Sequence, residues 1–249
     1  MTDVAIVVSS FDGFKATWEP FRHGFEKYWP DCPWPVRFLT NNLDAPLGET
    51  VKMGDDAGQH GWSRLSRTAL ETMSEDVVLW IHDDNWLTRP VHTDTIISLV
   101  RLFEHDDLHL IRLSNCYLCT TFGNEHKYDA RLRAIRPDSK QRCSLQPSLW
   151  RRNTLISLLV DGQSPWTFEG NAPNLAREII DGDFCCCRER FLPLRFLTHV
   201  DPDWDEEAVR RGEWTRTAVK YAARERIFVD FSTHPNGNKN ITVPYDHIR

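Results

Sequence analysis

Short apolar runs rich in β-branched residues recur along the first half of the chain and predict buried strands. They lack the apolar–polar alternation of a half-exposed strand, which is typical of a parallel sheet covered on both faces. The runs are Ala5–Val8, Val36–Thr40, Val77–Ile81 and Leu108–Leu113, with a shorter strand expected near Thr50–Met53.

Apolar residues at helical spacing separate these runs and predict three helices. They mark residues 21–29, 62–73 and 96–103. Pro20 suits the first position of the first helix, because a proline there loses no intrahelical hydrogen bond. Strands that alternate with helices predict an α/β fold with a mostly parallel sheet and helices on both of its faces.

The second half of the chain has a less regular pattern and predicts a smaller antiparallel extension. Strands are expected over residues 117–122, 130–135 and 142–150, and helices over 153–160, 172–180 and 205–226. The alternative for the last helix is a break at Gly212. Residues 231–249 are rich in Asn and Pro and predict an irregular arm. Without repeats or a clear linker, 1–249 is interpreted as one domain with two lobes, 1–113 and 114–230, and the arm.

Composition narrows the class of protein. The chain has 249 residues and a net charge of -6, which argues against a nucleic-acid partner. It shows no signal peptide and no apolar run long enough to span a membrane. We therefore expect a cytoplasmic protein, with a location at the inner face of the membrane as the alternative.

The seven cysteines are expected to be free thiols, because only one C-x-x-C pair, Cys116 and Cys119, has zinc-like spacing. Ten tryptophans indicate a site that stacks flat ligands such as sugars.

Acidic residues follow one of the predicted buried strands. Asp83, Asp84 and Asn85 come directly after Val77–Ile81. Ligands of open parallel sheets gather beyond the carboxyl ends of the strands, and oxygen ligands placed there suit Mg²⁺ or Mn²⁺ bound to phosphates. The alternative is a solvated loop with helix-capping acids.

Two later segments carry further candidate chemistry. Glu169 lies among aromatic residues just before a predicted helix, a setting that raises a carboxyl pKa toward general-base work. The alternative for Glu169 is a carboxylate that complements a helix dipole. The segment Ser144–Arg152 joins Gln146, Trp150 and two arginines, which match sugar hydroxyls or phosphates. Its alternative is a strand end with a buried tryptophan and surface arginines.

Together these segments resemble glycosyltransferases of the GT-A fold, and more closely bacterial sugar transferases from surface-polysaccharide gene clusters. The resemblance covers about 200 residues in a consistent order and is specific for fold and class, not for any sugar. The matching pieces are Val7–Asp12, Trp18–Phe21, Lys27–Pro33, Leu39–Asn41, Gly61–Leu65, Val77–Asp84, Ser144–Trp150, Pro165–Glu169 and Arg211–Trp214.

The resemblance implies roles for individual residues. Residues 1–113 would be a nucleotide-binding lobe, 114–230 an acceptor and catalytic lobe. Residues implied in binding the nucleotide sugar are Ser9, Ser10, Asp12, Asn41, Trp62, Arg64 (or Arg67), Asp83, Gln146, Trp150 and Trp166. Asp83 and Asp84 would stand for the Asp-x-Asp motif and hold Mn²⁺ or Mg²⁺, although here the two acids are adjacent.

Glu169 would be the catalytic base of an inverting transfer, with Asp84 as the second catalytic residue. Charge on the leaving diphosphate would be offset by the metal or by basic residues, for which the candidates are Arg151, Arg152, His199 and His234.

The expected function is transfer of a sugar from a nucleotide-sugar donor to a glycan or lipid-linked glycan acceptor in bacterial surface polysaccharide biosynthesis. The alternatives are a retaining or metal-independent transferase of the same fold, or a catalytically silent sugar-nucleotide or glycan-binding protein. The charged segment 205–226 is interpreted as a solvated helix face, and its interleaved acids argue against strong membrane binding. The alternative is peripheral contact of its basic residues with an anionic membrane surface. The sequence does not determine the oligomeric state. Four tryptophans, Trp62, Trp86, Trp150 and Trp166, are expected to cluster around one cleft.

Overall fold

The computed structural model describes residues 2–54, 61–105, 107–114, 122–197, 207–210 and 212–232. Its strands are β1 (Val4–Ser9), β2 (Val36–Thr40), β3 (Glu49–Lys52), β4 (Val77–His82), β5 (Leu108–Arg112), β6 (Phe122–His126), β7 (Asp129–Ile135), β8 (Ser148–Arg151), β9 (Asp183–Cys187), β10 (Val209–Arg210) and β11 (Glu213–Trp214). Its helices are α1 (Trp18–Tyr28), α2 (Trp62–Glu71), α3 (Thr93–Val100), α4 (Arg152–Leu158), α5 (Pro165–Ile179) and α6 (Arg216–Glu225), with short 3₁₀ helices η1 (Asp12–Thr17), η3 (Arg101–Glu104) and η4 (Glu189–Phe191).

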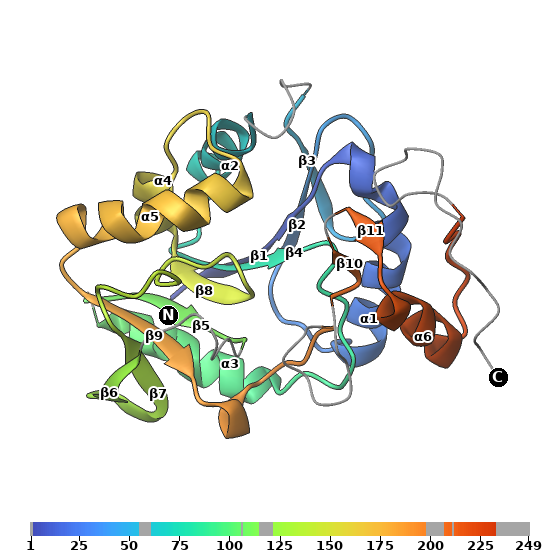
Figure 1. Cartoon of the computed structure of the whole chain (residues 1–249). Coiled ribbons are helices and arrows are strands. Elements are labelled where there is room, and N and C mark those ends of the chain that lie inside the picture. The colour runs from blue at the N-terminus through green and yellow to red at the C-terminus, as the bar shows by residue number, and fades with distance from the viewer. Residues whose placement is uncertain are drawn as a thin grey trace.

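Nine strands form one sheet in the order β3-β2-β1-β4-β8-β5-β9-β7-β6 (Figure 1). Only β8 and β7 run against the direction of the others, since β8 is antiparallel to β4 and β5, and β7 is antiparallel to β9 and β6. Strands from both predicted lobes share this sheet. The expected α/β class, a mostly parallel sheet with a smaller antiparallel part, is confirmed.

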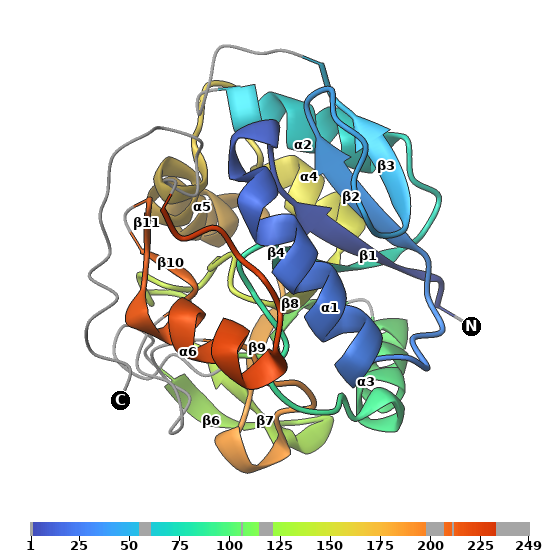
Figure 2. The same cartoon turned by 90° about the vertical axis from the view of Figure 1, so that its right-hand side faces the viewer.

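Helices cover both faces of the sheet and bury two apolar clusters. On one face, α1, α3 and α6 pack against alternate residues of β1 and β4 such as Ile6 and Leu79. On the other, α2, α4 and α5 pack against the intervening residues such as Val7 and Trp80. Figure 2 shows the sheet between α1 and the α4–α5 pair. The uninterrupted apolar runs of β1 and β4 follow from this burial on both sides.

The helix expected at residues 172–180 begins earlier than predicted. Ser164 caps it, because its Oγ accepts from the Thr167 N–H at 3.2 Å while the Ser164 N–H donates to Thr167 Oγ1 at 2.7 Å. Pro165 takes the first helical position, and Pro173 lies inside the helix rather than at its start. Glu169 is therefore part of α5 and does not precede a helix.

Two further expectations in the second half are corrected. The strand expected at 142–150 is reduced to β8, and residues 142–147 form turns and a loop. The helix expected at 205–226 begins only at Arg216, because Gly212 adopts a φ of 82° and turns the chain between β10 and β11. The expectations for residues 117–121, 205–206 and 233–249 lie outside the described residues, as do Cys116, Cys119, His199 and His234.

In the described ranges, no helix combines the length and the apolar character needed to cross a bilayer.

Candidate functional site

The carboxyl ends of β1 and β4 lie side by side and carry the first site residues. The pairing aligns Ser9 with His82. Because side chains alternate along a strand, Ser9 and His82 point to the α5 side of the sheet, while Ser10 and Asp83 point to the α1 side. Figure 1 shows this end of β4 between α5 and the β10–β11 hairpin.

Asp83 is a carboxylate buried on the α1 side of the sheet. Its Oδ2 accepts from Ser10 Oγ at 2.5 Å and from Trp18 Nε1 at 3.2 Å. Burial raises the pKa of Asp83 to about 6, against the hydrogen bonds from Ser10, Thr17 and Trp18, which lower it. These contacts tie the loop after β1 to α1 and to the end of β4, so they explain Asp83 as an internal anchor.

Asp84 lies at the edge of the sheet and is half-buried. Its Oδ1 accepts a long hydrogen bond from Asn85 Nδ2 at 3.4 Å. Burial, followed by the negative charges of Asp83 and Glu207, raises the pKa of Asp84 to about 8. The two adjacent acids therefore differ in their surroundings. Asp83 is hydrogen-bonded inside the protein, whereas Asp84 remains at the strand end.

On the α5 side of the sheet, a series of contacts links the carboxyl ends of β1 and β4 to α2, α5 and the loop before β8; we call this series the circuit. Trp62 Nε1 donates to Ser9 Oγ at 3.2 Å, and the Trp62 ring meets the Phe168 ring edge-on at 5.7 Å between centroids. Glu169 follows Phe168, and its Oε1 accepts from the Leu145 N–H at 2.7 Å. The Leu145 carbonyl accepts a hydrogen bond from the His82 ring, which returns the circuit to β4.

Glu169 is held on one side only. Its Oε1 accepts from Ser144 Oγ at 2.9 Å as well as from the Leu145 N–H. Its Oε2 has no hydrogen-bond partner within the part of the chain that the structure describes. A half-buried carboxylate with one fixed oxygen and one available oxygen has the geometry needed to accept a proton.

His82 and Leu145 complete this arrangement, and the sequence did not single them out as site residues. Burial lowers the pKa of His82 to about 4, so the ring is neutral near pH 7. Leu145 lies between His82 and Glu169. Its N–H donates to Glu169 Oε1, and its carbonyl accepts from the His82 ring. The strand alternation that places His82 on the same face as Trp80 was the one available signal.

Asp12 and Asn41 bind each other where β1 and β2 end. The Asp12 carboxylate accepts from the backbone N–H groups of Asn41, Asn42 and Leu43 at 3.0–3.1 Å. Asn41 Oδ1 accepts from the Asp12 N–H at 3.1 Å, and Asn41 Nδ2 donates to the Gly54 carbonyl. Both side chains brace the loops that border the predicted nucleotide pocket, and contact with a nucleotide stays a prediction.

The remaining predicted binding residues lie at different depths. Gln146 belongs to the loop that leads into β8, and it is half-buried beside Ser144, whose Oγ accepts from the Gln146 N–H at 3.3 Å. Trp166 is 65% exposed in the first turn of α5, three residues before Glu169. Arg64 is exposed on α2. Arg67, its alternative, donates to the Leu159 carbonyl and pairs with Asp161 at 3.0 Å.

Arg151 and Arg152 lie beside the amino end of β4, whereas the candidate site lies at its carboxyl end. Their expected role beside the leaving group is therefore wrong. β8 runs antiparallel to β4, with Ser148 beside Trp80 and Arg151 beside Val77. Three residues of strand separate these positions by about 10 Å. Both guanidiniums donate to backbone carbonyls there, Arg151 to Leu108, Phe103 and His105, and Arg152 to Glu75 and Leu70.

The expected clustering of four tryptophans around one cleft is also wrong. Trp86 and Trp150 are both 0% exposed and belong to apolar clusters on opposite faces of the sheet. Trp86 packs on Trp214 and Tyr221, and Trp150 packs on Phe184. Trp62 and Trp166 remain near Glu169, so most of the tryptophan content serves packing.

The acidic side chains at the carboxyl end of β4 show whether the predicted divalent metal ion fits there. Across the described ranges, no three His, Cys, Asp or Glu side chains converge to hold a metal ion. Asp83 is engaged by Ser10 and Trp18, which leaves Asp84 as the protein carboxylate at the strand end. One carboxylate fits Mg²⁺ or Mn²⁺ that is held mainly by substrate phosphates.

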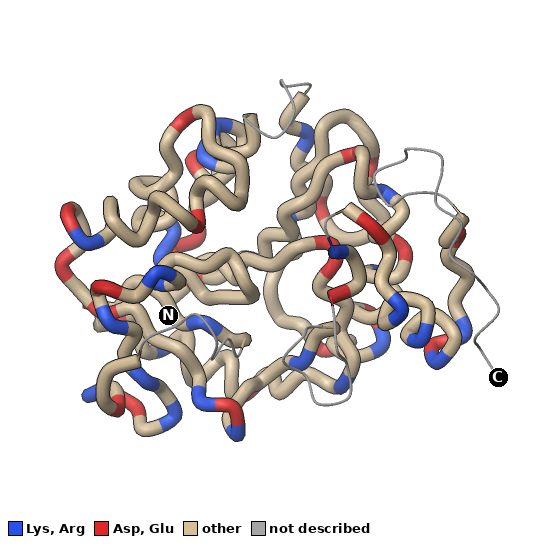
Figure 3. Tube along the Cα trace, in the orientation of Figure 1, with Lys and Arg blue, Asp and Glu red and all other residues tan. Residues whose placement is uncertain are grey.

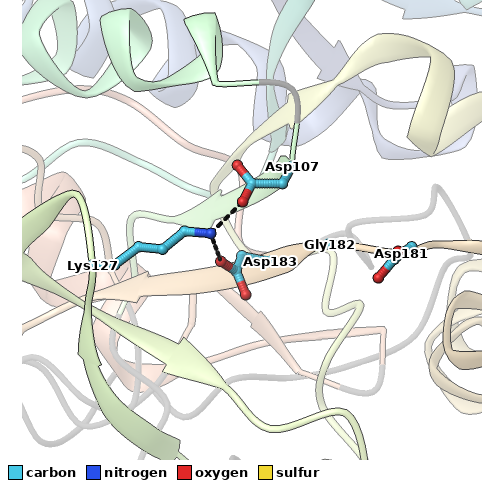
Figure 4. A pocket seen from close by; sticks show the side chains of 5 residues that line it. All are labelled: Asp107, Lys127, Asp181, Gly182 and Asp183. Atoms are coloured by element: carbon cyan, nitrogen blue, oxygen red, sulfur yellow. Dashed lines mark hydrogen bonds and ion pairs between the residues drawn. The ribbon is translucent and has the colours of Figure 1, made fainter.

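A polar hollow of about 350 Å³ lies at the opposite edge of the sheet (Figure 4). Its lining residues are Asp107, Lys127, Asp181, Gly182 and Asp183. Lys127 pairs with both Asp107 and Asp183, and Asp181 adds a third carboxylate to the lining. The amino ends of β5 and β9 form this edge, and the hollow is therefore separate from the Asp84–Glu169 edge.

Comparison with known proteins finds similarity of fold. No model of a known protein family matches the chain, and no curated protein matches it. Solved structures that resemble it include S. aureus TarS 1–349 (13% identity, TM-score 0.45, 75% of this chain and 60% of that one). Others are M. tuberculosis glucosyl-3-phosphoglycerate synthase with phosphoglyceric acid (16%, 0.41, 76% and 73%) and CMP:2-keto-3-deoxy-manno-octonic acid synthetase with CTP (12%, 0.46, 90% and 98%).

The TM-scores of these neighbours are all below 0.5, so they are reported as similar folds and do not establish a family for this chain. The chain spans about half to two thirds of the length of the first structures it matches. Because identities are 12–16%, the likeness concerns the fold, and the function has to be argued from the site.

Proposed function

We propose that the chain is a glycosyltransferase that moves a sugar from a nucleotide-sugar donor to a glycan acceptor in surface-polysaccharide biosynthesis. The observation that supports this most is the circuit from Ser9 through Trp62 and Glu169 to His82. It holds an available carboxylate oxygen beside the strand end that carries Asp84. A transferase of this kind needs a base for the acceptor and an acidic strand end for the donor diphosphate.

Glu169 is the proposed base of an inverting transfer. The acceptor hydroxyl oxygen attacks the anomeric carbon of the donor, and its proton passes to Glu169 Oε2. The bond between the anomeric carbon and the diphosphate oxygen breaks, and its electron pair leaves with the diphosphate. Ser144 and the Leu145 N–H fix Oε1 during this step, so the carboxylate keeps its direction without a change of rotamer.

The donor is proposed to lie across the ends of β1 and β4. Ser9 and Trp62 would border the nucleotide, while Gln146 and Trp166 would border the sugars. Mg²⁺ or Mn²⁺ would be held by Asp84 together with the donor phosphates, and when bound it supplies positive charge near the leaving diphosphate. Asp83 would act through the fold, since its contacts with Ser10 and Trp18 hold the strand end in place.

Donor binding is tested by thermal unfolding of the full chain with nucleoside diphosphates and their sugars, with and without Mn²⁺. A ligand at a hundred times its Kd adds about 2.7 kcal/mol of stability. We expect at least one nucleotide to raise the melting temperature. Asp84→Asn should remove the part of the rise that depends on Mn²⁺. If no nucleotide stabilises the protein, the donor site is wrong.

Catalysis is tested by donor turnover in Glu169→Gln. Loss of a general base lowers turnover about 10²–10⁴-fold, whereas nucleotide binding should remain. Glu178→Gln is the matched control, because Glu178 is an exposed acid on the same helix. Wild-type turnover in Glu169→Gln would refute the mechanism. Retention of the anomeric configuration in the product would support the retaining alternative, and binding without turnover would support a binding protein.

A further inference from the structure

Three cations form a stripe along the exposed face of α6. Arg216, Lys220 and Arg224 are spaced four residues apart and are exposed, whereas the intervening face of α6 packs against the core. Residues four apart on a helix are surface neighbours, so the three side chains occupy one strip. Figure 3 shows this basic segment at the right-hand side of the molecule, at its periphery.

The electrostatics of an isolated helix would not favour this stripe. Like charges four residues apart repel each other and destabilise a helix. Arg216 stands in the first turn, where the helix dipole favours acids, and that turn contains none. The one acid of α6, Glu225, points into the protein with a side chain that is 0% exposed and pairs there with Arg224 Nε at 2.7 Å. Arg216 and Lys220 are therefore the cations of the stripe that no acid of α6 offsets. The exposed face of the helix is therefore cationic, although the whole chain carries a net charge of -6.

A protruding phenylalanine lies directly beyond the stripe. Arg226 adopts a left-handed φ of 57° at the end of α6 and turns the chain. Val229 and Phe231 are 8% and 6% exposed and hold the following segment against the core, while Phe228 is 88% exposed. Burial of a phenylalanine ring is favourable, and Phe228 does not gain that stabilisation while it is exposed to water.

We propose that Arg216, Lys220 and Arg224 together with Phe228 form a docking surface for an anionic lipid membrane. Each cation near such a surface contributes about 1 kcal/mol of attraction, and an apolar ring inserts at the headgroup boundary. The charge of the stripe is complementary to anionic headgroups. A single exposed ring can insert between lipid headgroups without a preformed pocket. This inference does not depend on the proposed glycosyltransferase activity.

The test is co-sedimentation of the full chain with vesicles of phosphatidylcholine, with and without phosphatidylglycerol, at low and high salt. We expect binding that requires phosphatidylglycerol and weakens with salt. The double variant Arg216→Gln and Lys220→Gln, which leaves the Arg224–Glu225 pair intact, should bind roughly thirtyfold more weakly. Phe228→Ser should bind about tenfold more weakly and keep its salt dependence.

The controls match each change elsewhere on the surface. Lys140→Gln and Arg177→Gln remove the same charge from other exposed positions, and Ile179→Ser removes another exposed apolar side chain. Equal binding to both vesicle types, or equal losses in controls and test variants, would overturn the proposal. Binding to a soluble polyanion without binding to vesicles would overturn it as well. The response of melting temperature to nucleotides should stay unchanged in all variants, which separates this proposal from the proposed activity.

Discussion

Replacement of Glu225 by Gln should loosen the contact between α6 and α1. The Glu225 carboxylate accepts from Lys27 Nζ, Tyr28 Oη and Arg224 Nε at 2.7 Å each, and lies 3.3 Å from His23 Nε2. An acid in the last turn of a helix is unfavourable for the helix dipole. Its position is therefore explained by these partners, three of which lie on α1.

The magnitude follows from the acidity of this carboxyl group. Burial by itself raises the pKa of Glu225, but the hydrogen bonds from Lys27, Tyr28, Arg224 and His23 outweigh it and lower the pKa to about 2. A fall from the ordinary 4.5 to that value corresponds to about 3 kcal/mol of folding stability. Solvent screens the partly exposed cations, so we expect a loss of about 2–3 kcal/mol.

The pH dependence has a defined sign. Because the pKa is lowered in the folded protein, the contribution is fully present above about pH 4.5, the ordinary value, and is lost as the pH falls toward about 2. The difference in stability between wild type and Glu225→Gln should therefore be largest near pH 7 and should shrink in acid.

The assay is chemical and thermal unfolding of both proteins at pH 7 and in acid. At pH 7 the variant should melt about 4–12 °C lower. Glu26→Gln is the control, since Glu26 forms an exposed pair with Arg22 that is worth about 1 kcal/mol or less. A loss below about 0.5 kcal/mol at pH 7, or a difference that persists unchanged in acid, would refute the reasoning.

Two matched pairs of substitutions test the packing around the site. Gly24→Ala should cost about 1–3 kcal/mol in urea unfolding, because the added Cβ would lie 2.6 Å from Tyr221 Oη. Gly170→Ala, with open space around its Cβ, should instead gain up to about 1 kcal/mol, and equal effects would contradict this contrast. Trp18→Phe should cost about 1–3 kcal/mol more than Trp80→Phe, because the Trp18 N–H serves the buried carboxylate after β4 while Trp80 Nε1 has no partner among the described residues. If Trp80→Phe proves the more costly in the same assay, the anchoring role of Trp18 is wrong.

Much of the first half of the fold was predictable from local pattern. The apolar runs that became β1, β2 and β4 are buried on both faces, so their composition alone marks them as strands. The helices between them show their apolar faces at regular spacing, and α1 and α2 lie where that spacing predicts. The second half was harder, because its strands are short and its prolines admit two positions for the start of α5.

The candidate site was predictable in part, for the same physical reason. Asp84 and Glu169 were predicted from residue type and neighbours, and their role at a site stays a prediction. The structure joins their segments through Leu145 and His82. The different surroundings of Asp83 and Asp84 follow from the alternation of side chains at a strand end. Which side of the sheet would be occupied by Ser10 and Trp18 was not visible in the sequence.

The sequence by itself determined the strands, the main helices and the types of side chain available at the carboxyl ends of β1 and β4. The sequence placed β8 in an antiparallel extension, and the tertiary structure alone decided that it pairs with β4 and β5. This pairing, antiparallel to both, carries Gln146 to the candidate site and Arg151 to the opposite end of the strands. Strand direction depends on how the chain crosses between distant segments, whereas the apolar pattern of a buried strand reads the same in both directions.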